Sequence, residues 1–183
     1  MRPRFTLVVV TSRDGFIGRT SGDSPHTWAS PEEQRLFLSE VAAADWAVMG
    51  RRTHEAADRP NRRRIVFSGT AGAGDWRRPA QLWLDPTTLT PADLEPLVSR
   101  VHPLKAGLIL GGTRVHDWFL AHDAIDEVHL TVEPLTFGTG LPLFTEHRGD
   151  PRGFLPALGF ASTGETPLNP VGTAYSVWTP ARP

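Results

Sequence analysis

The chain has 183 residues, which is long enough for one domain with a substantial core and short for two. Hydrophobic residues make up 39% of it, charged residues 21%, and the formal net charge is −1, so the composition favours neither nucleic acid nor an acidic membrane as a partner. The sequence contains no cysteine, which excludes disulfides, thiolate chemistry and zinc–thiolate sites.

The N-terminal segment 1–15 predicts a first strand and not a signal peptide, because Arg13 and Asp14 follow the apolar run too soon. Residues 5–10, FTLVVV, form a β-branched run that is typical of a strand buried on both faces. No apolar run approaches the roughly 20 residues that span a bilayer. We therefore expect a cytoplasmic protein.

Residues 30–44 predict the first helix. Ser30 stands at the N-cap, Pro31 at the first helical position, and Glu33 where its carboxylate can close a capping box. The same carboxylate, one turn inside a helix and close to Phe37, could instead be the acid of a ligand pocket. The local sequence leaves both alternatives open.

Strands and helices continue to alternate as far as about residue 135. Further strands are predicted at 46–50, 63–69, 81–85, 106–112 and 126–135, and further helices at 51–57, 90–101 and 113–122. The tail at 156–180 predicts two strands joined by a turn. We therefore predict one α/β domain over residues 1–183, with three layers, a mostly parallel central sheet, helices on both of its faces and an antiparallel C-terminal hairpin.

Three segments combine a strand end, a glycine and the start of a helix or loop, and ligands of such sheets bind beyond the carboxyl ends of the strands. In the first, VMGRRTHEA, Gly50 turns the chain and Arg51, Arg52 and Thr53 occupy the first helical turn. Cations are unfavourable there for the helix alone, so the two arginines predict a bound phosphate. The alternative is a pair of solvated surface arginines.

The second segment is LILGGTRVHDWF, where Gly111 and Gly112 would let a pyrophosphate approach the next helix closely. The third is IVFSGT, which offers the hydroxyls of Ser68 and Thr70 and the amide of Gly69. A tight packing turn and an ordinary polar turn are the respective alternatives. Because all three segments end strands of one sheet, we expect them to converge on one extended phosphate-bearing ligand.

The order and spacing of these segments resemble the dihydrofolate reductase superfamily, which includes the reductase domain of the bifunctional riboflavin-pathway deaminase-reductases. The similarity covers about residues 5–144 and rests on MGRRTHE, PNRRRIVFS, ILGGTRVHDWFL, IDEVHLT and FGTGLPLF. The resemblance implies NADPH as the cofactor and hydride transfer to an electron-poor carbon. Carried over residue by residue, it implies cofactor contacts for Ile17, Gly18, Gly50, Arg51, Arg52, Thr53, Ser68, Gly69, Gly111, Gly112, Thr113, Arg114 and Val115.

The two branches of the superfamily differ in their substrate-binding residues, and the sequence has features that resemble both. Trp28, Glu33 and Phe37 keep the spacing of true dihydrofolate reductases, with Arg62 at the place of the arginine for the folate glutamate carboxylate and Thr139 at that of the threonine that bonds the acid.

The opening TSRDGFIG, followed by SGDS and SPEEQR, resembles the riboflavin-type reductases, in which Asp14, Ser24 and Arg35 would face the substrate. We place the chain in this second branch, with a small pterin- or pyrimidine-like heterocycle as substrate. The resemblance to this branch also implies a homodimer. A dihydrofolate reductase proper, and a nucleotide-binding homologue without turnover, are the alternatives.

The reduction needs a proton as well as a hydride, and a buried carboxyl can supply it. Glu33 is the first candidate for the acid and Asp14 the second, although Asp14 could simply be the residue of an Asp-Gly turn. His116 and His129 have no carboxylate at metal-ligand spacing in the sequence, so we predict no metal site.

Overall fold

The first predicted strand lies at the centre of the fold. In the computed structural model, which describes residues 1–181, β1 (Arg4–Thr11) runs between β7 (Ala106–Ile109) and β8 (Glu127–Val132), and both neighbours are parallel to it. Phe5 and Leu7 on β1 are fully buried. Val8 is only partly buried, because it borders a cavity. The sequence predicted a strand buried on both faces, and the structure shows that this burial is incomplete.

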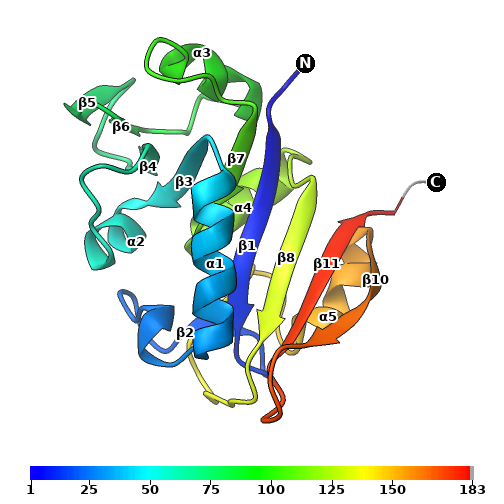
Figure 1. The fold of residues 1–183 in the computed structure, drawn as a ribbon. Helices are drawn as coiled ribbons and strands as arrows, with labels where there is room; N and C mark the ends of the chain where they lie inside the picture. The colour runs from blue at the N-terminus through cyan, green and yellow to red at the C-terminus, as the bar shows by residue number, and fades with distance from the viewer. Residues whose placement is uncertain (182–183) are drawn as a thin grey trace.

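The complete sheet has nine strands in the order β10-β11-β8-β1-β7-β3-β4-β6-β5 (Figure 1). The remaining strands are β3 (Trp46–Gly50), β4 (Arg64–Phe67), β5 (Asp75–Arg78), β6 (Gln81–Leu84), β10 (Phe160–Pro167) and β11 (Ala174–Pro180). The strands from β8 to β6 are parallel, while β11 and β10 at one edge and β5 at the other add antiparallel pairs. The predicted mostly parallel sheet with an antiparallel C-terminal hairpin is confirmed.

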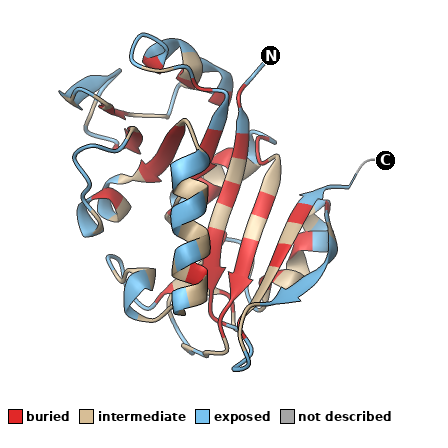
Figure 2. Cartoon of the chain, in the orientation of Figure 1, coloured by how far each residue is buried: buried red, intermediate tan, exposed pale blue. Residues whose placement is uncertain are grey.

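Helices cover both faces of this sheet. α1 (Pro31–Ala43) lies across one face and α4 (Thr113–Ala121) behind the other, while α2 (Arg51–Ala56) directly follows β3 (Figure 1). Figure 2 shows the buried residues concentrated along the strands and the outer side of α1 exposed. The core between the layers includes Phe5, Leu7, Trp46, Ile65, Leu84, Phe119 and Val128. Among residues 1–181, no helix is both long enough and apolar enough to cross a membrane.

Several short elements differ from the predictions. The glycine-rich segment after β4 contains the edge strand β5, and β2 (Phe16–Gly18) pairs with β9 (Leu141–Pro142) in a small separate sheet. The helix predicted at 90–101 divides into a 3-10 turn, η2 (Pro91–Asp93), and the short α3 (Leu94–Val98). Pro96 lacks the N–H that a continuous α-helix would need at that position.

Other short helices surround these elements. They are η1 (Pro25–Thr27), α5 (Pro151–Phe154) and η3 (Leu155–Leu158), none of which the sequence predicted. The parallel strands β3, β4 and β7 matter most for the site. Because they are parallel, their carboxyl ends all lie on the same side of the sheet.

Candidate active site

A cavity of about 1280 Å³ follows the carboxyl ends of β3, β4 and β7 and the facing side of α1. The glycine-bearing turns after these three strands all line it, so they meet at one cavity; the ligand predicted there stays a prediction. The residues predicted to contact a cofactor also lie on its wall: Ile17, Gly18, Gly50, Arg51, Arg52, Thr53, Ser68, Gly69, Gly111, Gly112, Thr113, Arg114 and Val115.

The turn after β7 packs closely on the turn after β3. The N–H of Gly50 donates to the carbonyl of Gly111 at 2.7 Å, and a Cβ added to Gly50 would lie 3.6 Å from Val115. Gly111 has a φ of +102°, which side chains rarely tolerate, and its peptide bond to Gly112 is cis. A Cβ added to Gly69 would meet nothing within 4 Å. The turns therefore leave room for a ligand to approach the backbone.

His116 on α4 borders the same turn and is buried. Its Nδ1 lies 2.9 Å from the carbonyl oxygen of Leu143, so Nδ1 carries the proton and donates it to that oxygen. Nε2 has no hydrogen-bond partner among residues 1–181. Burial lowers the pKa of His116 to about 4, which leaves the imidazole neutral near neutral pH and unsuited to act as an acid.

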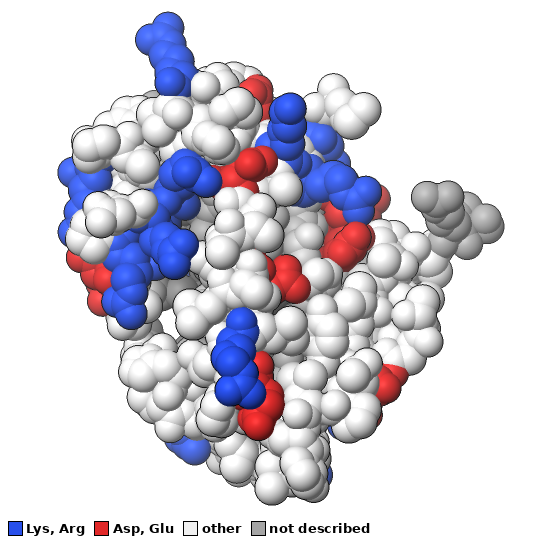
Figure 3. Space-filling view, viewed as in Figure 1, with Lys and Arg blue, Asp and Glu red and all other residues white. Residues whose placement is uncertain are grey.

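Basic side chains gather on the α2 side of the cavity, where Figure 3 shows a cluster of Lys and Arg atoms. Arg51 and Arg52 are exposed in the first turn of α2, and Arg52 donates to the hydroxyl of Ser21 at 2.9 Å. Within residues 1–181, neither arginine pairs with a carboxylate. Across the turn after β4, the hydroxyls of Ser68 and Thr70 lie 3.2 Å apart on the same wall. This combination favours an anionic ligand.

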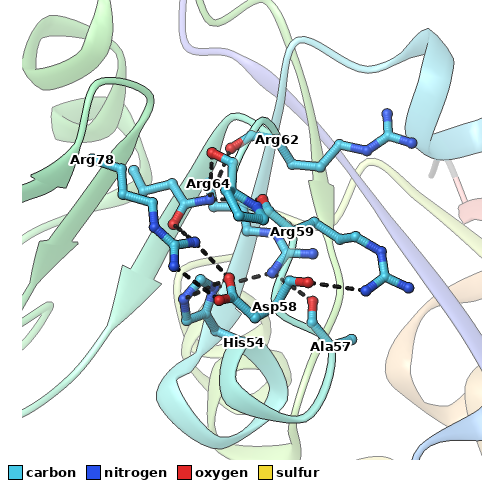
Figure 4. Close-up of polar contacts among 9 residues, drawn as sticks. His54, Ala57, Asp58, Arg59, Arg62, Arg64 and Arg78 are labelled. Carbon is cyan, nitrogen blue, oxygen red and sulfur yellow. Dashed lines mark hydrogen bonds and ion pairs between the residues drawn. The ribbon is translucent and has the colours of Figure 1, made fainter.

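The loop between α2 and β4 adds two more arginines to the wall. Asp58 accepts two hydrogen bonds from Arg78, which lower the pKa of Asp58 to about 2, and the side-chain amide of Gln81 donates to the Arg59 carbonyl at 2.9 Å. These contacts fix the loop. The side chain of Arg62 extends away from the Asp58–Arg78 pair, and the guanidinium of Arg59 donates to the carbonyl oxygen of Asp58 at 2.9 Å (Figure 4). Both arginines line the cavity.

Glu33 faces the cavity and not the helix end. The hydroxyl of Ser30 accepts from the Glu33 N–H at 3.2 Å, as predicted for the N-cap. The N–H of Ser30, however, donates to the carboxylate of Glu133 at 2.7 Å, so of the two alternatives left open for Glu33 the capping box is not formed. The Glu33 carboxyl instead accepts from the side-chain amide of Gln34 at 2.6 Å and lines the cavity.

The surroundings of Glu33 favour its neutral form. The residue is only 4% exposed, and desolvation raises the pKa of its carboxyl from 4.5 to about 7. The hydrogen bond from Gln34 opposes this rise, and the negative charge of Glu133 adds to it. A carboxyl with a pKa near neutrality can both hold and release a proton under physiological conditions.

Asp14 has a different role. Its carboxylate accepts from the hydroxyl of Ser12 at 2.6 Å and from the backbone N–H groups of Phe137 and Gly138 at 3.1 and 2.8 Å. Desolvation would raise the pKa of Asp14, but these hydrogen bonds outweigh it and lower the pKa. Asp14 does not line the cavity. The structure therefore makes Asp14 a turn-fixing carboxylate and does not support it as the second candidate for the acid.

The predicted substrate residues divide into two groups. Phe37 and Arg62 line the cavity, whereas Trp28, Arg35 and Thr139 do not. Trp28 packs edge-on against Phe137, and Thr139 is exposed and forms no hydrogen bond with the acid within the described chain. Arg35 is exposed because it lies two residues from Glu33, which places it on the opposite side of α1. The structure thus places these three residues outside the cavity lining and gives their predicted substrate contact no support.

Other cavity residues on α1 went unpredicted. Gln34, Leu38 and Val41 line the wall beside Glu33 and Phe37. Residues four apart lie on the same side of a helix, as Gln34 and Leu38 do, and as Phe37 and Val41 do. This spacing could have revealed the cavity residues once Glu33 was assigned to the cavity.

Of the remaining predicted polar residues, Ser24 also lines the cavity. His129 lies elsewhere, between carboxylate oxygens of Glu40 and Glu127 at 2.5 and 2.9 Å, partners from α1 and β8 that the sequence did not suggest. Within residues 1–181, no group of three or more acidic or histidine side chains is arranged to hold a metal ion.

Comparison with solved structures gives the class of the fold. The chain superposes on dihydrofolate reductase from Enterococcus faecalis, complexed with NADP(H), with a TM-score of 0.67 and 18% identity over 98% of this chain and 97% of that one. At this identity the likeness shows a dihydrofolate reductase-like fold.

The model of the RibD C-terminal domain family matches residues 3–162, so the chain belongs to this family. A putative riboflavin biosynthesis protein from Shewanella sp. PV-4 has a TM-score of 0.71 and 21% identity over 100% of both chains. A deaminase/reductase from Thermotoga maritima has a TM-score of 0.70 and 17% identity over 98% of this chain and 57% of that one. A search of curated proteins found no match.

Proposed function

We propose that the chain is an NADPH-dependent reductase that transfers a hydride to a pterin- or pyrimidine-like heterocycle, in the riboflavin-reductase-like branch of its superfamily. The observation that carries the proposal is the position of Glu33. Its buried carboxyl, with a pKa of about 7, lines the same cavity as the glycine turns and the arginines. This arrangement suits a hydride transfer completed by a proton, because the wall can bind a phosphate-bearing cofactor and the acid can supply the proton.

The wall fits a phosphate-bearing dinucleotide. Gly111 and Gly112 leave space for a pyrophosphate beside the start of α4, and Arg51, Arg52 and Ser68 would hold a further phosphate. That further phosphate is what distinguishes NADPH from NADH. When bound, the cofactor supplies the hydride. The similar fold of the NADP(H)-complexed enzyme from E. faecalis supports this assignment.

The chain itself supplies the proton and the positioning. Near neutral pH roughly half of the Glu33 carboxyls are protonated, so Glu33 can give a proton to the ring nitrogen beside the carbon that is reduced. Phe37, one turn further along α1, offers an aromatic side chain to a flat ring. Most of the rate enhancement would come from holding the substrate ring at the cofactor in the correct orientation.

The other end of the substrate would meet positive charge. Arg59 and Arg62 extend from a fixed loop on the same wall, which favours a substrate with an anionic tail. The T. maritima protein with a similar fold is a 5-amino-6-(5-phosphoribosylamino)uracil reductase as well as a deaminase, which makes this pyrimidine the first substrate to test. Dihydrofolate, whose tail carries carboxylates, is the second.

The experiment has two parts. Fluorescence titration with NADPH and with NADH should show tighter binding of NADPH, by about tenfold or more, because only NADPH offers the extra phosphate to the arginines. NADPH oxidation is then followed with the phosphoribosylaminouracil and with dihydrofolate. Equal affinity for the two cofactors would refute the NADPH assignment. Tight NADPH binding without oxidation in the presence of either substrate would favour the nucleotide-binding alternative.

A further inference from the structure

Gln34 forms a side-chain pair with Glu33 inside the cavity. The two residues are consecutive on α1, about 100° apart around the helix, and both line the wall. The Nε2 of Gln34 donates to Oε2 of Glu33 at 2.6 Å, which is short for an N–H···O bond. The dihydrofolate reductase-like spacing of the sequence did not mark Gln34, and the proposed function does not use it.

The two oxygens of the Glu33 carboxyl are therefore not equivalent. Oε2 accepts the hydrogen bond from Gln34, whereas Oε1 accepts no hydrogen bond from any residue between 1 and 181. A proton on Oε2 would point an O–H donor at an N–H donor, which is unfavourable. The neutral carboxyl therefore carries its proton on Oε1.

The neighbouring carboxylate does not compete for that proton through a direct contact. Glu133, just beyond β8, accepts from the Ser30 N–H with Oε1 and from the Thr173 hydroxyl with Oε2. Glu32, on the same helix as Glu33, accepts from Asn169. The charge of Glu133 acts on Glu33 through space only, and Gln34 is the residue that contacts the acid.

We propose that Gln34 is a positioning residue for the acid: its amide occupies Oε2 of Glu33 and so directs the proton to Oε1, the oxygen left available to the substrate. This inference rests on the proposed function. It assigns to Gln34 the orientation of the proton, which Glu33 alone does not determine.

Gln34 also affects the pH dependence of the acid. The Gln34 hydrogen bond stabilises the ionised carboxylate and so lowers the pKa of Glu33 against the rise that burial causes. Without this donor the pKa of Glu33 rises further. The acid works in its protonated form, so the activity falls as the pH rises through the pKa of Glu33. Without the Gln34 donor, this fall would occur at a higher pH than in the wild type.

The test compares Gln34→Met with the wild type. Methionine keeps the length and apolar contacts of glutamine and removes the donor. The titration midpoint of Glu33, measured by carboxyl ¹³C NMR and assigned with Glu33→Gln, should rise by about one pH unit in Gln34→Met. The falling limb of the kcat–pH profile should move in parallel, and kcat below that limb should drop about tenfold because the proton is no longer confined to Oε1.

Arg35→Gln is the matched control, since Arg35 lies on the opposite, exposed side of α1. It should leave both the midpoint and the pH profile unchanged. An unchanged midpoint in Gln34→Met would overturn the proposal, because a side chain that only fills space would give that result. The NMR titration needs no substrate. A shifted midpoint in a protein that oxidises no NADPH would therefore support the Gln34–Glu33 contact while refuting the proposed reductase.

Discussion

Replacing Glu33 by glutamine should make the protein more stable at high pH while removing its acid. The wild-type carboxyl has a pKa of about 7 when folded against 4.5 as a free side chain. The folded chain thus binds the proton more tightly than the unfolded chain. The stability that the neutral carboxyl contributes is complete below about pH 4.5 and is lost as the pH rises through about 7.

The magnitude follows from the difference between the two pKa values. Between about pH 5 and about pH 8.5, linkage predicts that the wild type loses about 2.5 kcal/mol of unfolding free energy through this one group. Glu33→Gln keeps a similar shape and has no charge to bury, so it does not suffer this loss. The free energy of unfolding of the variant minus that of the wild type should therefore rise by about 2.5 kcal/mol across this interval.

Urea denaturation of both proteins at several pH values measures this difference. Every other titrating group is shared by the two proteins and cancels to first order in the subtraction. A difference that stays constant with pH would show that the folded carboxyl titrates like an exposed one. Glu33 would then not be the buried acid on which the proposed chemistry depends.

Two further predictions concern the arginines and Asp14. Replacing both Arg51 and Arg52 by glutamine should weaken NADPH binding about tenfold or more and leave NADH binding nearly unchanged, because the proposed function assigns these two charges to the extra phosphate of NADPH. Fluorescence titration checks this, and a parallel loss for both cofactors would contradict it. Asp14→Ala should reduce the free energy of unfolding by about 1–3 kcal/mol, because it leaves the N–H groups of Phe137 and Gly138 without their acceptor, while kcat stays within about twofold. A large fall in kcat at unchanged stability would restore Asp14 as a candidate for the acid.

The sequence predicted that the glycine turns would lie together because the determinants of that arrangement are local. Gly50, Ser68 and Gly111 each lie at the carboxyl end of a strand or within two residues of it, and parallel strands place these ends on one side of the sheet whatever the rest of the chain does. The strand β5 was missed for a local reason too, since it follows a glycine-rich segment that resembles a loop.

The positions of the residues predicted to contact a substrate were less accessible from the sequence, because they depend on contacts between distant segments. The cap of α1 uses Glu133, which is 103 residues away from Ser30, and Asp14 meets a loop 123 residues further on. No local pattern marks such partners. Helical phase explains the remaining error: Arg35 and Glu33 lie in one helix, but only Glu33 faces the cavity, and the sequence alone did not fix which face that is.

Steady-state kinetics of Glu33→Gln with NADPH and the phosphoribosylaminouracil test most directly whether Glu33 is the acid. Loss of the acid should lower kcat by about 100-fold or more, while the dissociation constant of NADPH, measured by fluorescence, stays within about twofold. A variant that turns over at the wild-type rate would contradict the account, because Glu33 would then be a buried structural carboxyl and the proton would come from elsewhere.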